Sequence, residues 1–160
     1  MLRTLDIASA GFDPLKLQAI NELGAGRNAK TQLQFKQRVW SAKGAWPGIS
    51  NGSSYSDTGY QSSWESTRAQ TGPSGILVFY SAGDVTSALK SKQSTATVAD
   101  AQVATDAGTT LRRAEQVFPG LTRAWNGKAT ESIPHLSRFF KNSYAYYRTG
   151  QYLQFAGYEK

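Results

Sequence analysis

The sequence predicts an α+β fold, and three stretches of the chain carry that prediction. Residues 31–40 (TQLQFKQRVW) alternate between apolar and polar side chains, which is typical of a half-exposed antiparallel strand. Residues 75–81 (GILVFYS) form a short apolar run between turn-forming residues, as expected of a central buried strand. Residues 98–118 place apolar side chains at helical spacing. A chain of 160 residues with these elements is large enough for one domain with a core.

The N-terminal part begins with residues 1–12, which fit a strand or a loop. Asp13-Pro14 then marks a helix start, because Asp accepts hydrogen bonds at an N-cap and Pro fits the first helical position. We predict a helix over residues 13–23 that ends at Gly24.

The stretch from Gly24 to Ala29 formally matches the GxGxxG/A fingerprint of dinucleotide-binding folds. That fingerprint needs a strand before it and a helix after it, so that the helix N-terminus faces the pyrophosphate. Here a predicted helix precedes the glycines and the alternating strand follows them. We therefore reject this stretch as a phosphate-binding loop. The strand that follows is expected to carry Leu33, Phe35 and Val39 on one face and Gln32, Gln34 and Lys36 on the other.

Residues 41–73 are rich in Gly and Ser. Within them Asn51-Gly52 is typical of a hairpin turn, and residues 61–68 fit a strand or a loop. Three tryptophans lie in or beside the segment: Trp40, Trp46 and Trp64. The segment is either an adaptable wall or lid of a site or an ordinary surface loop.

The middle of the chain is organised around the long helix. We expect a short helix at residues 84–89 and a polar connection at 90–97. Thr97-Val98-Ala99-Asp100 resembles a capping box with Asp in place of Glu, so the long helix is expected to begin at residue 98. It should stop before Pro119-Gly120, and residues 121–128 are predicted to form a strand.

The C-terminal run from Lys141 to Phe155 (KNSYAYYRTGQYLQF) is the most distinctive stretch of the sequence. Rings at this density either fill a core or line a site. An extended strand would place Tyr144 and Tyr146 on one face and Tyr147 on the other. Such a strand offers tyrosines to a core and to a cavity at once.

The composition excludes several function classes. Lys and Arg number 18 against 11 Asp and Glu, so the formal charge is +7, but the basic residues are scattered and no nucleic-acid binding is expected. There is no cysteine, which removes disulfides, thiolate nucleophiles and Cys-ligated metals. No apolar run approaches a membrane span and the start lacks a signal peptide, so we expect no membrane partner and a cytoplasmic location.

The residues by themselves name no reaction. The single histidine, His135, has no carboxylate or second histidine at ligand spacing, so no metal site is expected. There are no paired carboxylates of the glycosidase type and no serine in a nucleophile elbow.

The order of several short motifs resembles the flavin-containing amine oxidase family, which includes monoamine, polyamine and L-amino acid oxidases. The motifs follow one another along essentially the whole chain: Phe12-Asp13-Pro14-Leu15, Phe35 with Val39-Trp40, Phe118-Pro119, and the tyrosine-rich block from Ser143 to Tyr152. The resemblance implies a mixed, mainly antiparallel sheet flanked by helices. It also implies that this domain roofs the isoalloxazine ring of an FAD held by a separate domain.

The same resemblance implies site residues and a reaction. Tyr144 falls where one of two rings facing each other across the flavin is expected, and Tyr146 and Trp64 are further substrate-binding candidates. The family often places a lysine upstream of the Phe-x-Pro segment, near flavin N5; Arg3 is the nearest match here and is the catalytic candidate. The expected reaction oxidises an amine or an L-amino acid to the imine with release of hydrogen peroxide.

The resemblance covers only the substrate-binding half of such an oxidase. Residues 1–160 are expected to form one substrate-binding domain or fragment, without the Gly-rich FAD fingerprint. We therefore expect an FAD-binding domain or subunit as partner, a small amine or amino acid as ligand, and little activity of the chain alone. The alternative is a non-catalytic interaction module that forms a homodimer.

Overall fold

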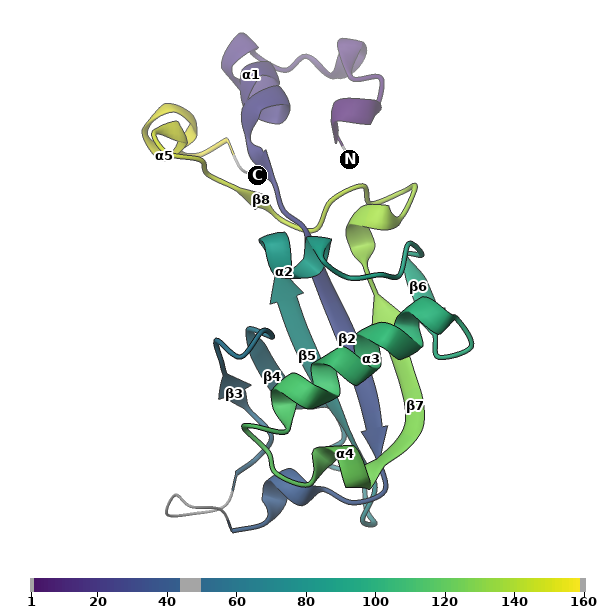
Figure 1. The fold of residues 1–160 in the computed structure, drawn as a ribbon. Coiled ribbons are helices and arrows are strands. Elements are labelled where there is room, and N and C mark those ends of the chain that lie inside the picture. The colour runs from purple at the N-terminus through teal and green to yellow at the C-terminus, as the bar shows by residue number, and fades with distance from the viewer. Residues whose placement is uncertain (1, 44–49, 159–160) are drawn as a thin grey trace.

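The computed structural model describes residues 2–43 and 50–158, and the α+β class is confirmed (Figure 1). Within these residues six strands form one sheet. In spatial order they are β3 (Ser54–Tyr55), β4 (Ser62–Glu65), β5 (Gly75–Ala82), β2 (Asn28–Phe35), β7 (Trp125–Ser132) and β6 (Thr95–Thr97). Every pairing among these described strands is antiparallel.

β2 is an inner strand of the sheet and lies between β5 and β7. Its alternation is confirmed, because Leu33 and Phe35 are fully buried while Gln32 and Gln34 are half-buried. The strand begins and ends earlier than predicted, since it pairs with the whole of β5 from Asn28 to Phe35. The chain then leaves the sheet into a 3-10 helix, η3 (Val39–Ser41), so the prediction that Val39 lies in the strand was wrong.

α3 (Ala101–Ala114) covers one face of the sheet and, with it, encloses the main core. Its buried residues Val103, Ala107 and Leu111 share a cluster with side chains of β2 and β5. The helix begins at Ala101 rather than residue 98, because Asp100 is the N-cap and accepts a hydrogen bond from the Gln102 N–H at 2.8 Å. The predicted capping box at Thr97 was therefore wrong.

The elements around α3 follow the prediction in part. α2 (Gly83–Ser87) confirms the short helix, while β6 lies inside the stretch predicted as a polar connection. α4 (Leu121–Ala124) takes the first half of the predicted strand at 121–128, and β7 begins only at Trp125. The Glu115 carboxylate explains the extra helical turn, because it accepts hydrogen bonds from the Gly120 and Thr122 N–H groups at 2.6 and 2.7 Å.

The hairpin predicted at Asn51-Gly52 lies further along the chain. β3 pairs with β4, so the turn falls between Tyr55 and Ser62. Gly52 instead packs inside, with φ of 78°, where an added Cβ would lie 2.7 Å from Cδ2 of Leu77.

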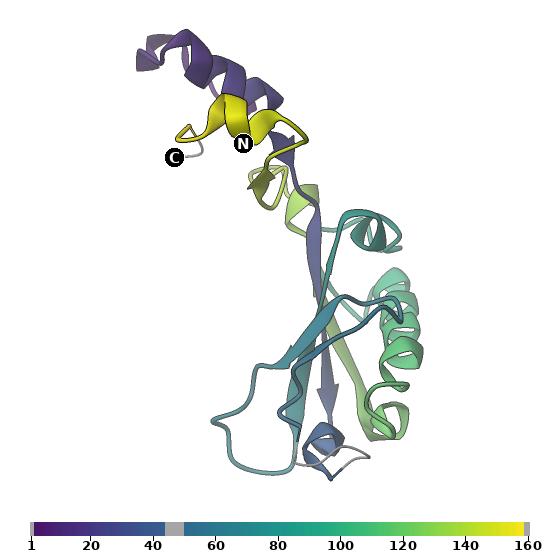
Figure 2. The same ribbon diagram turned by 90° about the vertical axis from the view of Figure 1, so that its left-hand side faces the viewer.

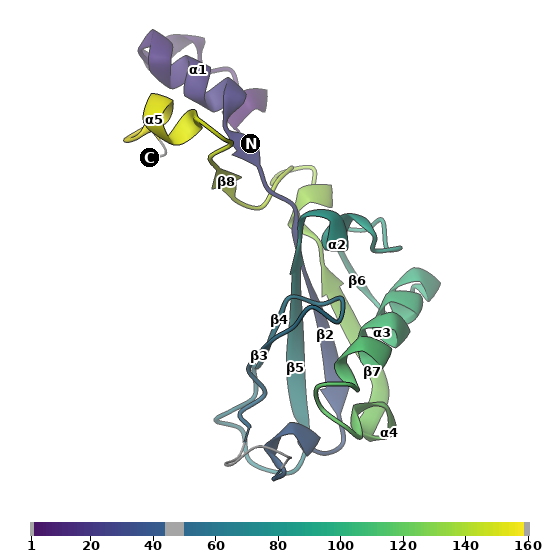
Figure 3. The same ribbon diagram turned by 60° about the vertical axis from the view of Figure 1, so that its left-hand side comes forward.

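A small lobe stands at one end of the sheet (Figure 3). In it α1 (Pro14–Glu22) packs against α5 (Gln151–Phe155) around a core of Ala19, Leu23 and Phe155. Two 3-10 turns, η1 (Leu2–Thr4) and η2 (Ala8–Ala10), precede α1. The predicted helix start is confirmed, since Oδ1 of Asp13 accepts a hydrogen bond from the Lys16 N–H at 3.0 Å.

A two-stranded ribbon joins the lobe to the sheet. β1 (Gly24–Ala25) pairs with β8 (Ala145–Tyr146), and η4 (Pro134–Leu136) lies between β7 and β8 in the chain. The order of helix, glycines and strand agrees with the rejection of the dinucleotide fingerprint. Among residues 2–43 and 50–158, no helix combines the length and the hydrophobicity that crossing a bilayer requires.

Candidate functional site

The candidate site lies on the face of the sheet opposite α3, which we call the outer face. Figure 2 shows the sheet edge-on, with α3 and α4 on one side and no described helix against the other. Because side chains alternate along a strand, residues next to the buried Ala29 and Thr31 of β2 point to the outer face. This leaves a broad surface of the sheet for a ligand or a partner.

Lys30 occupies the end of the outer face nearest the ribbon. It is exposed, and the register places it between Tyr80 of β5 and Ser132 of β7. Its ammonium lies 5.8 Å from the centroid of the Trp64 ring, within the range of a cation–π contact. No carboxylate of the described residues lies within 4.0 Å of it. Lys30 therefore presents a positive charge that has no ion-pair partner in the part of the chain that the structure describes.

Tyr144 reaches the same end of the sheet through the ribbon. The Gly26 N–H donates to the Tyr144 carbonyl at 2.7 Å, and the Ser143 N–H donates to the Gly26 carbonyl at 2.9 Å. The Ser143 hydroxyl also accepts a hydrogen bond from the Asn28 N–H at 2.9 Å. These bonds fix the backbone on either side of Tyr144 against the start of β2, although the two segments are far apart in the sequence.

A cavity of about 210 Å³, which we call the Lys30 cavity, lies where these groups meet. It is lined by Asn28, Ala29, Lys30, Tyr80, Ser132, Pro134, Phe140, Asn142, Ser143 and Tyr144. The lining thus joins one cation and several hydroxyl groups with the rings of Tyr80, Phe140 and Tyr144. Such a mixture suits a small ligand with a flat apolar part and a few polar atoms.

The Tyr80 hydroxyl is held in place within this cavity. It accepts a hydrogen bond from Nδ2 of Asn28. Burial, and after it the neighbouring Tyr144 hydroxyl, raises the pKa of Tyr80 above its ordinary value. Tyr80 therefore stays protonated at neutral pH and remains a hydrogen-bond donor.

The tryptophans predicted to form a wall or lid do not lie together in the structure. Trp64 lies on the outer face beside Tyr80, with ring centroids 6.1 Å apart, and touches Lys30, so it borders the Lys30 cavity without lining it. Trp40 is a core residue, since its ring packs edge-on against Phe35 at 5.3 Å and its Nε1–H donates to Glu65 at 2.9 Å. Trp46 lies outside the described residues.

The tyrosine-rich run is only partly extended. β8 contains two residues, and the chain turns into α5 soon afterwards. The predicted facing agrees with the structure, because Tyr144 and Tyr146 are exposed while Tyr147 packs on the core of the small lobe. Tyr144 lines the Lys30 cavity, whereas Tyr146 lines a separate cavity of about 620 Å³ that Tyr144 also borders.

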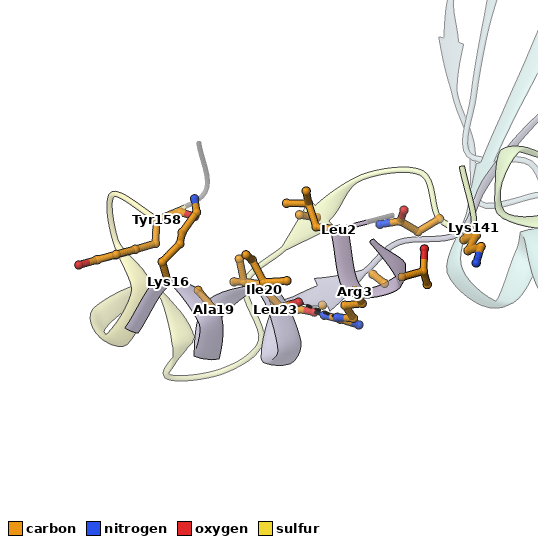
Figure 4. A pocket seen from close by; sticks show the side chains of 13 residues that line it. Leu2, Arg3, Lys16, Ala19, Ile20, Leu23, Lys141 and Tyr158 are labelled. Carbon is orange, nitrogen blue, oxygen red and sulfur yellow. Dashed lines mark hydrogen bonds between the residues drawn. The ribbon is translucent and has the colours of Figure 1, made fainter. Parts of the chain in front are cut away.

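Arg3 lies in the small lobe, away from the Lys30 cavity (Figure 4). Its Nε donates to the Ile20 carbonyl at 2.7 Å and its Nη2 donates to the Leu23 carbonyl, so the guanidinium caps the C-terminal end of α1. It lines a cavity of about 360 Å³ together with Lys16 and Tyr158. The structure thus brings Lys30, and not Arg3, into one cavity with Tyr144.

Sequence reasoning missed Lys30 and Tyr80, although a signal for one of them existed. The alternation that placed Gln32 and Gln34 on the outer face extends one step back to Lys30. Tyr80 gave no such signal, because the run GILVFYS is apolar at almost every position and does not show which residues face outwards.

The described residues offer no alternative site of the metal type, since they contain no cluster of three potential ligands. His135 has its Nδ1 buried without a hydrogen-bond partner among them. Burial, and then the charges of Arg27 and Lys92, lowers the pKa of His135. It is therefore a neutral side chain at the end of the sheet.

Comparison with known proteins places the chain. No curated protein matches it. The family model described as flavin containing amine oxidoreductase matches residues 4–156, which is nearly the whole chain and includes every element that builds the Lys30 cavity. By this match the chain belongs to the family of flavin-containing amine oxidoreductases.

Proposed function

We propose that this chain is the substrate-binding part of an FAD-dependent oxidase that acts on a small amine or amino acid. The observation that carries the proposal is the Lys30 cavity: in a chain of this family, Lys30, Tyr80 and Tyr144 meet on a sheet face that no described helix covers. Membership of the family supports a flavin and an amine. The Lys30 cavity supports the assignment of Lys30, Tyr80 and Tyr144 as the residues that contact the flavin and the amine.

The groups of the outer face fit the ring system of a flavin. Its isoalloxazine is flat and carries polar atoms at its edges, and the outer face offers flat rings, the Lys30 ammonium and the hydroxyls of Tyr80 and Ser132. The described residues offer no glycine-rich loop for the pyrophosphate of FAD, because the Gly24 to Ala29 stretch leads into a strand and not into a helix. We therefore assign Lys30 and its neighbours to the flavin ring and assign the phosphates to an FAD-binding domain or subunit.

When bound, the flavin accepts the hydrogen and the two electrons removed from the carbon that bears the amine. Water would then hydrolyse the imine, and oxygen would take up the two electrons with two protons to give hydrogen peroxide. The part of this chain is to bind and orient the amine. The exposed ring of Tyr144 attracts the cationic form of the substrate, with a cation–π contact worth roughly 0.5–2 kcal/mol.

Lys30 then favours the reactive form of the substrate. Hydride loss requires a neutral amine, and a nearby positive charge disfavours the ammonium form and so lowers the pKa of the bound amine. In this proposal Lys30 also takes the role expected of Arg3, as the cation that would lie near flavin N5. The capping contacts of Arg3 with Ile20 and Leu23 support this change of assignment.

The experiment that tests the function is peroxide release by the native enzyme that contains this chain. A panel of primary amines, polyamines and amino acids is tested in two assays: peroxide is measured in air, and bleaching of the flavin absorbance is measured without oxygen. We expect at least one class of compound to bleach the flavin without oxygen. In air, the same class should release one peroxide for each substrate molecule oxidised. A flavin that no member of the panel reduces would rule out the oxidase function.

A further inference from the structure

A second cavity, of about 620 Å³, lies on the other side of Tyr144, between the ribbon and α2. We call it the arginine cavity, because Arg27 and Arg148 both line it. Its further lining includes Tyr144, Tyr146, Asp84 and Ser87. Arg27 follows β1 and Arg148 follows β8, and because the two strands run antiparallel the arginines reach this cavity from opposite ends of the ribbon.

Both guanidinium groups are exposed and lack a carboxylate partner. No ion pair joins either of them to a described residue within 4.0 Å, although Asp84 lines the same cavity. Arg27 donates only to the Ser87 hydroxyl, at 3.3 Å, which is long for such a bond. The guanidinium of Arg148 makes no hydrogen bond to the described residues. The cavity therefore holds ten N–H donors, five on each guanidinium, of which one is used.

The backbone that carries Arg148 is held firmly. The Arg148 N–H donates to Oε1 of Gln151 at 2.9 Å, and the Gln151 N–H donates to the Arg148 carbonyl at 3.0 Å. Nε2 of Gln151 in turn donates to the Glu22 carbonyl at the end of α1, at 2.9 Å. The backbone of Arg148 is thus fixed relative to the ribbon before any ligand arrives, so only its side chain has to be ordered on binding.

The charge of the lining selects the ligand. Two arginines and one aspartate give the cavity a net charge of +1, which a single negative charge neutralises. A carboxylate carries that charge and matches the fork of a guanidinium. A phosphate dianion carries more negative charge than the net +1 of the lining neutralises, and it is repelled by the carboxylate of Asp84.

We propose that the arginine cavity binds a carboxylate through Arg27 and Arg148. The carboxylate belongs either to the substrate itself, whose amine then lies in the Lys30 cavity, or to a separate small molecule. In both cases the bound carboxylate lies against Tyr144, which the two cavities share. In the first case the proposal rests on the oxidase function and narrows the substrates to amines that carry a carboxylate.

The test is titration of the purified chain, followed by the Nε–Hε signals of its arginines in ¹⁵N NMR spectra. The probes are acetate, inorganic phosphate, and the pair L-phenylalanine and 2-phenylethylamine, which differ only in the carboxylate. Acetate and L-phenylalanine should shift the Arg27 and Arg148 signals in a saturable way, and 2-phenylethylamine should not. The variants Arg27→Gln and Arg148→Gln should each weaken acetate binding by about tenfold or more.

Arg112 of α3 provides a matched control. It is exposed and donates to one hydroxyl, that of Thr109, at 3.0 Å, much as Arg27 does to Ser87. Arg112→Gln should leave acetate binding unchanged. Shifts of equal size at Arg112, no saturation at Arg27 and Arg148, or binding of phosphate but not of acetate would each overturn the proposal.

The same titration separates the two sources of the carboxylate. L-Phenylalanine that binds about tenfold tighter than acetate indicates the substrate's own carboxylate, and equal affinities indicate a separate molecule. Because the NMR readout needs no flavin, carboxylate binding can succeed where oxidase activity fails. If the oxidase is active but carboxylates do not shift the arginine signals of the chain, this inference is overturned and the proposed function stands.

Discussion

The ring of Tyr146 lies directly against Gly24, its partner across the ribbon. A Cβ at residue 24 would lie 2.4 Å from Cζ of Tyr146, far inside contact distance. Glycine is therefore favoured here by the position of the ring and not by the backbone conformation, since Gly24 is not among the glycines with positive φ. The pair fixes the ribbon on which Tyr144, Arg27 and Arg148 depend.

Gly24→Ala should displace the Tyr146 ring and weaken the small lobe. Because the Tyr146 ring is 51% exposed and can rotate outwards, the cost is about 1 kcal/mol, the lower end of what overpacking costs in a core. We expect this loss in urea denaturation, together with changed NMR signals of Tyr144 and Tyr146. Gly108→Ala is the control, and it should have the opposite effect on stability. A Cβ at residue 108 of α3 would lie 3.7 Å from Arg112 Nη1, which is an ordinary contact. Alanine should therefore stabilise the helix by about 1 kcal/mol. A Gly24→Ala variant as stable as the parent would contradict the role given to this contact.

Tyr144→Ala in the native enzyme should lower turnover while the flavin absorbance stays intact. Loss of a cation–π contact of roughly 0.5–2 kcal/mol corresponds to a decrease of about 2- to 30-fold in kcat/KM. Tyr144→Phe keeps the ring and should retain most of the activity. The control is Tyr55→Ala, because Tyr55 is 92% exposed on β3 at the far edge of the sheet. Unchanged kcat/KM in Tyr144→Ala would remove this residue from the site.

Lys30→Met should lower the rate of flavin reduction near neutral pH by about tenfold for each unit by which Lys30 lowers the pKa of the bound amine. The optimum should also move to higher pH, because the bound amine then regains its higher pKa. Stopped-flow absorbance of the flavin measures both. Lys36→Met is the matched control, since Lys36 is an exposed lysine that follows the end of the same strand. If the two variants behave alike, Lys30 has no special role.

Glu131 should make the stability of the chain depend on pH. The side chain is buried beneath α3, where Oε1 accepts a hydrogen bond from the Thr31 hydroxyl at 2.9 Å and Oε2 has no partner among the described residues. Burial raises the pKa of Glu131 to about 7, and the carboxylates of Asp106 and Asp100 add to the shift.

Because the folded-state pKa exceeds the ordinary value of 4.5, folding is favoured while the group is protonated. The free energy of unfolding should therefore fall as the pH rises from 4.5 to about 7, by roughly 3 kcal/mol, and stay level above that range. His135, whose pKa is lowered, gives a slope of opposite sign up to its ordinary pKa of 6.5, so the comparison has to be made between variants.

Urea denaturation of the parent and of Glu131→Gln from pH 5 to 8 measures the Glu131 contribution as a difference. The variant should lose this contribution and gain relative stability at high pH. Glu115→Gln is the control, because hydrogen bonds from Thr122 and Gly120 lower the pKa of Glu115. The effect of Glu115 on the free energy of unfolding therefore changes with pH only below pH 4.5, outside the range measured. A parent and a Glu131→Gln variant with parallel pH curves would show that Glu131 is charged in the folded state.

The isolated chain should purify without colour and release no peroxide with amines, because the described residues contain no loop suited to the FAD pyrophosphate. Absorbance at flavin wavelengths and light scattering test this together. Restored activity on addition of the FAD-binding part would support the expected partner. A yellow protein with one flavin per chain would contradict the prediction, and a colourless dimer that no FAD-binding part activates would favour the interaction module.

The parts of the fold that the sequence predicted are those with local causes. β2 and β5 follow from alternation and from an apolar run, and the start of α1 follows from Asp13 and Pro14. β6 and β8 were not predictable, because their few residues are strands only through pairing with distant segments. α4 depends on hydrogen bonds to the side chain of Glu115, which the pattern of residues 121–128 does not reveal.

The residues of the candidate site were likewise predicted only where the sequence carries a local signal. Tyr144 stood out because of the density of rings around it and because of the family motif. Lys30 was passed over because an exposed lysine at the start of a strand looks like any solvated residue. Only the ribbon, which joins residues 24–25 to residues 145–146, shows that Lys30 and Tyr144 share one cavity.

The ribbon also sets the order in which the molecule can be completed. The last strand of the large sheet ends at Ser132, so that sheet has all its strands before the tyrosine-rich run leaves the ribosome. A chain cut after Lys141 should keep the core beneath α3 and yet lack Tyr144 and the wall it provides. Formation of the pocket is thus a late step, separate from folding of the scaffold that carries it.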